Sequence, residues 1–184
     1  SDEIRYYKLD IDVPHVVCPF SYEINDIYVP YNKNRRPKSF VPISNFVATY
    51  QNFPPEAEEA FEFALGILEE IIPTPIQINV LAQFDQLDGG TLASAGATDF
   101  FIVTGGGLPD NTIFPIALAE KLIAENLNEA DFDLRVSIDE RTNWYYDFNN
   151  PTDISGQFDF VSVVLHEMLH GLGFLSFTAV EGSL

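Results

Sequence analysis

Residues 46–84 constrain the fold most strongly, because their hydrophobic periodicity changes twice within a short stretch. Residues 46–50 have the composition of a strand. Apolar residues at helical spacing follow a Pro-Pro pair and end before another proline, which predicts a helix over residues 54–72. Apolar and polar residues then alternate over residues 76–84, the pattern of a half-buried strand. This stretch therefore predicts a strand, a helix and a strand in that order.

The rest of the chain contains shorter patterns of the same two kinds. Glycine-rich segments after the strands predict turns, and Asp159 is suited to cap the last helix. The order of elements within one body predicts an α+β fold built on a mixed sheet. We expect strands over residues 100–104, 134–138 and 144–146, helices over 115–126 and 159–172, turns at 88–90 and 105–107, a loop over 149–156, and β-like stretches at 4–11 and 27–29.

Charge is distributed unevenly along the chain. The 184 residues carry 28 acidic and 9 basic side chains, a formal net charge of −19. Residues 1–38 hold six acidic and six basic side chains, so all of the net charge falls in the remainder. We therefore predict an extended N-terminal segment or arm over residues 1–40, with a basic loop at 32–38, and one folded body over residues 41–184.

Composition excludes several classes of partner. Binding to the phosphate backbone of nucleic acid requires clustered Lys and Arg, and an anionic membrane surface would repel a chain with this charge. The longest apolar runs fall far short of a bilayer span, whereas 46% hydrophobic residues suffice for a substantial core. We expect a soluble globular protein that neither inserts into a membrane nor binds nucleic acid; its oligomeric state is not predicted.

The residues that carry chemistry are concentrated in the last predicted helix. It contains His166-Glu167-Met168-Leu169-His170, an HExxH motif. Residues four apart lie on one face of a helix, so the imidazoles of His166 and His170 can converge on one zinc ion. Glu167 is rotated by about 100° from His166, where it can act as general acid/base on a metal-activated water. The motif therefore predicts metal-dependent hydrolysis of a peptide bond.

Together with Gly173, this motif resembles the zincin metalloproteases in their metzincin form, in which a glycine lets the chain leave the helix. Residues 75–177 are also similar to a family of secreted bacterial zincin-like proteins, in an Asn-Trp-Tyr segment at 143–145 and a Phe-Asp-Phe-Val segment at 158–161. The resemblance implies a zincin-like fold with a twisted mixed sheet and an HExxH active-site helix. It also implies a zinc endopeptidase, secreted or at the surface of a bacterial cell, that acts on protein or peptide substrates.

The sequence departs from the metzincin pattern after the motif. Metzincins place a third ligand three residues after the glycine, which here is Ser176, and a methionine turn beneath the metal, whereas Met168 is the only methionine. Glu181 is the sole ionisable side chain after the motif. Leishmanolysin-like metzincins insert a long segment before the third histidine. By this resemblance the third ligand would lie downstream of Leu184, and residues 41–184 would be a catalytic domain without its C-terminal subdomain.

Two alternatives to a peptidase stay open at this stage. A non-catalytic zincin-like module used for binding or surface display would not need a complete metal site. A different metallohydrolase, such as an amidase, would use the same motif, because HExxH determines the metal chemistry more closely than the acyl group that is cleaved.

Three further groups of residues have both a functional and a structural interpretation. Cys18, with His15 nearby, could hold the zinc in a latent form or be an ordinary buried cysteine. Residues 144–146 could line a substrate pocket, but we expect them in the core because aromatic side chains bury large areas. Calcium is a second cofactor to consider at three aspartates in loops, although their spacing is not that of an EF-hand and a solvated acidic surface is the default interpretation. These residues are Asp85, Asp88 and Asp110.

Overall fold

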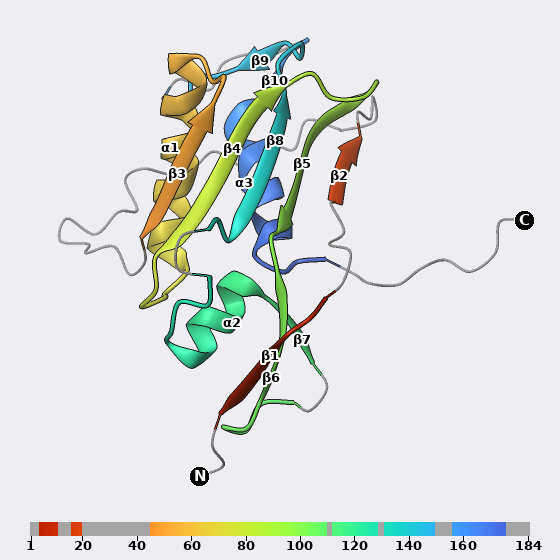
Figure 1. Cartoon of the computed structure of the whole chain (residues 1–184). Coiled ribbons are helices and arrows are strands. Elements are labelled where there is room, and N and C mark those ends of the chain that lie inside the picture. The colour runs from red at the N-terminus through yellow and green to blue at the C-terminus, as the bar shows by residue number, and fades with distance from the viewer. Residues whose placement is uncertain are drawn as a thin grey trace, which may run out of the picture.

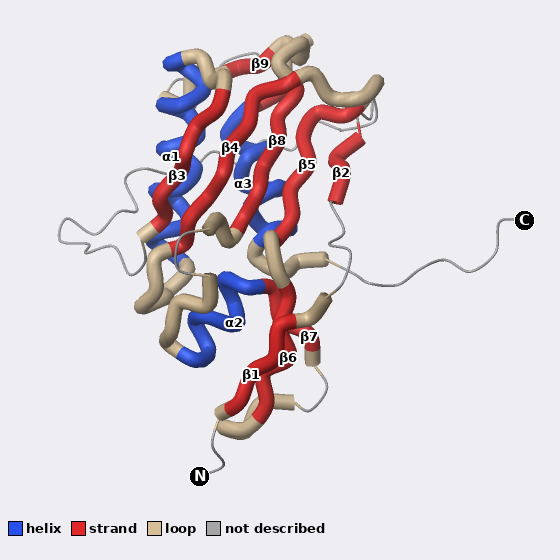
Figure 2. The backbone as a smooth tube through the Cα atoms, in the orientation of Figure 1, coloured by secondary structure: helices blue, strands red, loops and turns tan. Residues whose placement is uncertain are grey.

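The computed structural model of the chain describes residues 4–10, 16–19, 45–109, 112–128, 131–149 and 156–175, with only the backbone for residues 16–19. Figures 1 and 2 show the arrangement of the helices and strands. Within these ranges no helix is long and apolar enough to cross a membrane. In chain order the elements are β1 (Arg5–Lys8), β2 (Val16–Pro19), β3 (Phe46–Gln51), α1 (Pro55–Ile71), β4 (Ile78–Asp85), β5 (Thr91–Ala97), β6 (Phe100–Thr104), β7 (Ile113–Pro115), α2 (Ile116–Ile123), β8 (Leu134–Asp139), β9 (Trp144–Tyr145), β10 (Phe158–Asp159) and α3 (Phe160–Gly171).

A five-stranded mixed sheet forms the centre of the fold. Its strands lie in the order β2-β5-β8-β4-β3. Strands β3, β4 and β8 run parallel, whereas β5 pairs antiparallel with β8 and β2 pairs antiparallel with β5. Helices α1 and α3 lie beside one another on the same face of this sheet (Figure 1). The predicted α+β class with a mixed sheet is therefore confirmed.

The main core fills the space between this sheet and its two helices. The apolar positions of β4 that alternate in the sequence are buried, as are the positions at helical spacing on α1. The amphipathic patterns of strand and helix thus turn their apolar sides toward the same layer. The buried residues are Ile78, Val80, Ala82 and Phe84 on β4, and Phe61, Ala64, Leu65 and Leu68 on α1.

A smaller layer continues from the end of the main sheet. Strands β1, β6 and β7 form an antiparallel sheet, and α2 packs against β6 and β7 (Figure 2). Phe100, Phe101, Val103 and Ile116 are buried there in a second apolar cluster. The N-terminal part of the chain contributes to both sheets, because β1 pairs with β6 and β2 pairs with β5.

Most of the predicted elements are present, with some changes at their ends. The three predicted helices are confirmed as α1, α2 and α3. Helix α2 ends at Ile123, earlier than expected, because Ala124 adopts a left-handed conformation with a φ of 58°. The strand expected from residue 76 begins at Ile78, and Asp85 is its last residue rather than part of a loop. The stretches at 27–29 and 32–38, and residues 150–155 of the predicted loop, lie outside the described residues.

Strand β5 was not predicted at all, and neither were the short strands β7 and β10. The β5 sequence, Thr-Leu-Ala-Ser-Ala-Gly-Ala, lacks the large β-branched and aromatic residues that identify strands. Its small residues Ala93, Ala95 and Ala97 are nevertheless buried. The element order predicted from the sequence was therefore wrong in this part of the chain.

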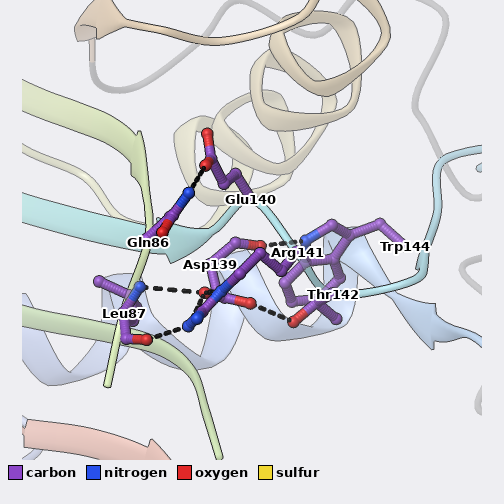
Figure 3. A network of polar contacts seen from close by, with 7 residues as sticks. All are labelled: Gln86, Leu87, Asp139, Glu140, Arg141, Thr142 and Trp144. Carbon is purple, nitrogen blue, oxygen red and sulfur yellow. Dashed lines mark hydrogen bonds and ion pairs between the residues drawn. The ribbon is translucent and has the colours of Figure 1, made fainter. Parts of the chain in front are cut away.

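A polar network ties the loop after β4 to the end of β8 (Figure 3). The carboxylate of Asp139 accepts hydrogen bonds from the backbone N–H of Leu87 at 3.0 Å, from Nε and Nη2 of Arg141 at 3.0 and 2.9 Å, and from Oγ1 of Thr142 at 3.1 Å. Burial raises the pKa of Asp139, but these donors and the charge of Arg141 outweigh it, so the pKa is lowered overall. Asp139 is therefore a strongly held carboxylate.

The same turn positions the start of α3. Nε1 of Trp144 donates a hydrogen bond to the carbonyl oxygen of Asp139 at 2.9 Å. The indole ring is buried and lies edge-on to Phe160 with the ring centroids 5.3 Å apart. Phe158 pairs with Trp144 in the β9–β10 ladder immediately before the helix begins. The expectation that residues 144–146 belong to the core is confirmed for Trp144, whereas Tyr145 and Tyr146 are only partly buried.

We predict that Asp139→Ala lowers the free energy of unfolding by about 2–3 kcal/mol, because it leaves the partly buried N–H of Leu87 without its acceptor and removes the ion pair with Arg141. Glu140→Gln is the control: Glu140 is exposed and accepts a hydrogen bond only on the surface, from Gln86, so a change within about 0.5 kcal/mol is expected. Since the pKa of Asp139 lies below its ordinary 3.8, the loss should shrink as the pH falls below that value. Denaturant titrations at pH 7 and pH 3 measure both effects; equal effects of the two variants would contradict the role of the network.

Candidate metal centre

Helix α3 carries the HExxH motif and begins at the predicted cap. Oδ1 of Asp159 accepts a hydrogen bond from the backbone N–H of Ser162 at 2.7 Å, which satisfies one of the free donors of the first turn. The helix turns one face toward the core and leaves its other side partly accessible. The buried residues are Phe160, Val161, Val164, Glu167, Met168 and Gly171.

Gly171 brings the C-terminal end of α3 unusually close to the sheet. A Cβ atom at this position would lie 2.3 Å from Cδ2 of Leu134 on β8 and 3.7 Å from the carbonyl oxygen of Gly96 on β5. Any other residue at this position would require the buried side chain of Leu134, the helix or the strand to move. The last turn of α3, which includes His170, is therefore held directly against β8 and β5.

The two histidines of the motif converge. Their Nε2 atoms are 2.9 Å apart, and their rings are nearly perpendicular. His166 is exposed and His170 is partly buried, so the pair can be reached from solvent. Two imidazole nitrogens at tetrahedral positions around zinc would be about 3.3 Å apart, given Zn–N distances of about 2.0–2.1 Å. The donor pair therefore fits a zinc ion after a shift of a few tenths of an ångström.

A backbone carbonyl orients one of these rings. Nδ1 of His170 lies 2.7 Å from the carbonyl oxygen of Phe174, and since a carbonyl can only accept, Nδ1 carries the proton. In the neutral ring Nε2 then carries the lone pair that metal binding requires, and it accepts the 2.9 Å hydrogen bond from Nε2–H of His166, whose proton must leave before both nitrogens can bind one metal. His166 remains available in its neutral form because burial, and then the charge of His170, lower its pKa.

Gly173 makes this orientation possible. Its φ of 117° is open to glycine but not to other residues, and a Cβ atom there would lie 2.9 Å from Cγ of Pro115. The chain leaves the helix at this point, and the N–H of Phe174 returns to the carbonyl oxygen of Leu169 at 2.9 Å. Sequence reasoning identified Gly173 but missed the Phe174 carbonyl, because a backbone acceptor leaves no signal in the sequence.

Glu167 occupies a different environment from the histidines. Its side chain is fully buried, and neither carboxyl oxygen has a hydrogen-bond partner among the described residues. Burial raises its pKa to about 7. The motif thus places a readily protonated carboxyl one residue from His166, on the buried side of the helix, with no hydrogen bond from either histidine.

The structure does not assemble the other residues singled out in the sequence. Asp85 accepts a hydrogen bond from Nδ2 of Asn52 at 3.0 Å, Asp88 is exposed, and Asp110 lies outside the described residues. In the part of the chain that is described, no three His, Cys, Asp or Glu side chains gather as a metal site. Calcium binding therefore stays a prediction. The side chains of His15, Cys18, Ser176 and Glu181 are likewise outside the described part, so latency and the third zinc ligand are untested.

Comparison with known proteins gives one partial match. A family model described as SPBPB7E8-like matches residues 112–179, which run from β7 through α3 but make up less than half of the chain. No curated protein and no solved structure matches the chain.

We predict that Gly171→Ala destabilises the protein by about 1–3 kcal/mol, because the added methyl group overlaps Leu134. The matched control is Gly66→Ala in α1, where a Cβ atom would meet nothing within 4 Å. This change should stabilise the protein by about 0.5–1 kcal/mol through helix propensity. Denaturant unfolding distinguishes the two signs; stabilisation by both substitutions would refute the close approach of α3 to β8.

Proposed function

We propose that the chain is a zinc-dependent endopeptidase in which His166 and His170 bind the metal and Glu167 is the general acid/base. The observation that carries the proposal is the 2.9 Å convergence of the two Nε2 atoms, with the Phe174 carbonyl holding His170 in the tautomer that can bind a metal. The HExxH spacing and the resemblance to zincins support a peptide bond as the target. The resemblance also supports a protein or peptide substrate and a secreted or surface location on a bacterium.

The chain's own groups suit the chemistry of peptide hydrolysis. Neutral imidazoles donate lone pairs to zinc, which lowers the pKa of a water when it is bound. Glu167 has a pKa of about 7 because of burial, so its carboxyl can take up a proton and release it again near neutral pH. We propose that it takes a proton from water and passes it to the leaving amine. This role requires the carboxyl to turn from the buried face of α3 toward the histidines.

A non-catalytic zincin-like binding or surface module is the second candidate. It is favoured by the position of Glu167, which is fully buried and without hydrogen bonds to either histidine. A module of this kind would bind zinc through His166 and His170 and hydrolyse nothing. The third ligand that a catalytic zinc site normally has is not assigned to a residue.

Zinc content and peptide cleavage, measured together, test the proposal. We expect one zinc per chain for the parent and for Glu167→Gln, and a loss of at least about 100-fold in zinc affinity for His170→Ala. Cleavage of a fluorogenic peptide library should fall by about 10²–10⁴-fold in Glu167→Gln, because proton transfer is lost while the metal stays. His15→Ala, which changes the only histidine outside the motif, is the matched control and should leave both readouts unchanged.

The outcomes separate the two candidates. Zinc binding without cleavage by the parent would favour a binding module, or a metal site without its third ligand, over a peptidase that is active in this chain. Equal zinc affinity in the parent and in His170→Ala would remove the metal centre from both.

A further inference from the structure

A second buried glutamate lies outside the candidate metal centre, in the last turn of α2. Glu120 is fully buried. Its Oε1 accepts a hydrogen bond from the backbone N–H of Leu127 at 2.8 Å, whereas Oε2 is buried and has no hydrogen-bond partner among the described residues. An acceptor left in this state costs about 1–3 kcal/mol, and more when it is charged. The position therefore requires a donor.

Asn128, the residue after Leu127, also has a buried acceptor without a donor. Its Nδ2 donates to the carbonyl oxygen of Phe132 at 3.2 Å and to Oδ1 of Asp133 at 3.0 Å. Its Oδ1 is buried and, like Oε2 of Glu120, finds no donor in the described part of the chain. Two acceptors without a donor among the described residues thus lie on either side of the Leu127 hydrogen bond, and a proton on the Glu120 carboxyl would turn Oε2 into a donor.

The chain path brings the Glu120 carboxyl to the residue that precedes Asn128. Helix α2 ends where the left-handed residue Ala124 donates its N–H to the carbonyl oxygen of Glu120 at 2.7 Å. The chain then folds back, so that Leu127 reaches the Glu120 carboxyl. On the far side, Asp133 joins the segment to the main sheet, since its carboxylate accepts the N–H of Asn79 at 2.7 Å. The cluster therefore connects α2 to the beginning of β8.

The surrounding charges favour a neutral Glu120. Burial raises its pKa to about 7, and the charge of the fully buried Asp133 adds to this, against the opposing hydrogen bond from Leu127. Asp99, the residue before β6, also raises the pKa of Asp133, and its carboxylate is paired with Nζ of Lys8 on β1 at 2.7 Å. Lys121 and Glu125 are the charged residues nearest in sequence on α2 and its C-terminal end; Glu125 is exposed.

We propose that Glu120 is a protonated acid that donates a hydrogen bond to Oδ1 of Asn128, and that loss of this proton releases residues 124–128 from α2. Residues 124–128, which we call the clasp, are thereby held against α2 at acidic pH and released at alkaline pH. The pKa of the Glu120 carboxyl is higher in the folded chain than its ordinary value of 4.5. The protonated carboxyl therefore makes its full contribution to stability below pH 4.5. The contribution is lost as the pH rises through about 7.

Two matched substitutions in the full chain test the clasp. Glu120→Gln keeps an acceptor for Leu127 and a permanent N–H donor for Asn128 but cannot ionise; Glu125→Gln removes the same charge from an exposed position. Unfolding equilibria between pH 5.5 and 9 are compared. Glu167 titrates in the same range in every variant, so the difference between the two variants isolates Glu120. Above pH 7 we expect the folding equilibrium constant of Glu120→Gln, divided by that of Glu125→Gln, to rise by up to tenfold per pH unit.

Amide hydrogen exchange provides the local readout. At pH 8.5 the Leu127 amide should exchange at least about tenfold faster in Glu125→Gln than in Glu120→Gln, and the two should agree at pH 5.5. The same pH dependence in both variants would overturn the proposal. So would failure of Glu120→Gln to fold, because glutamine retains both hydrogen bonds. Protection of Leu127 at pH 8.5 by millimolar calcium, absent in Glu120→Gln, would also overturn it, since a cation and not a proton would then join the two oxygens.

Discussion

The close packing of α3 on the sheet is the constraint on which the rest of the structure depends. At Gly171 there is no room for even a methyl group between the helix and Leu134 of β8. At the other end of the helix, Phe160 packs against Trp144, whose indole N–H donates a hydrogen bond to the carbonyl oxygen of Asp139 at the end of β8. The carboxylate of Asp139 in turn accepts four hydrogen bonds. A helix fixed at both ends cannot rotate about its axis, so the face that carries His166 and His170 is fixed as well. The candidate metal centre is thus a consequence of core packing.

The environment of each buried carboxyl decides its protonation in this strongly acidic protein. Asp139 is charged because N–H groups, a hydroxyl and a guanidinium surround it. Glu167 and Glu120 are buried more completely than Asp139 and, among the described residues, receive one hydrogen bond between them, and burial raises the pKa of each to about 7. Desolvation without compensating hydrogen bonds therefore produces two groups that exchange protons near neutrality. One adjoins the histidines, and the other joins α2 to β8.

The sequence predicts those parts of the fold in which periodicity and burial agree. Large apolar residues mark the buried sides of three elements, which could therefore be predicted from the sequence. These elements are helix α3 with its Asp159 cap, helix α1 and strand β4. Strand β5 could not be predicted, because α3 lies so close to it that its residues are mainly Ala, Ser and Gly. These small residues lack the β-branched and aromatic side chains from which a strand is predicted. The HExxH residues could be identified from the sequence as a motif. The burial of Glu167 depends on packing between segments that are far apart in the sequence. The Phe174 carbonyl and the Leu127 N–H lie close in sequence to their partners, but they are backbone groups, which leave no pattern in the sequence.

X-ray absorption at the zinc edge, recorded on the chain loaded with one equivalent of zinc, tests the proposed centre most directly. We predict two imidazole nitrogens at about 2.0–2.1 Å from the metal. The multiple-scattering signal of the histidine rings should fall by half in His166→Ala and in His170→Ala and be unchanged in His15→Ala. A zinc shell without imidazole scattering, or a spectrum that none of these substitutions changes, would contradict the assignment of His166 and His170 as metal ligands.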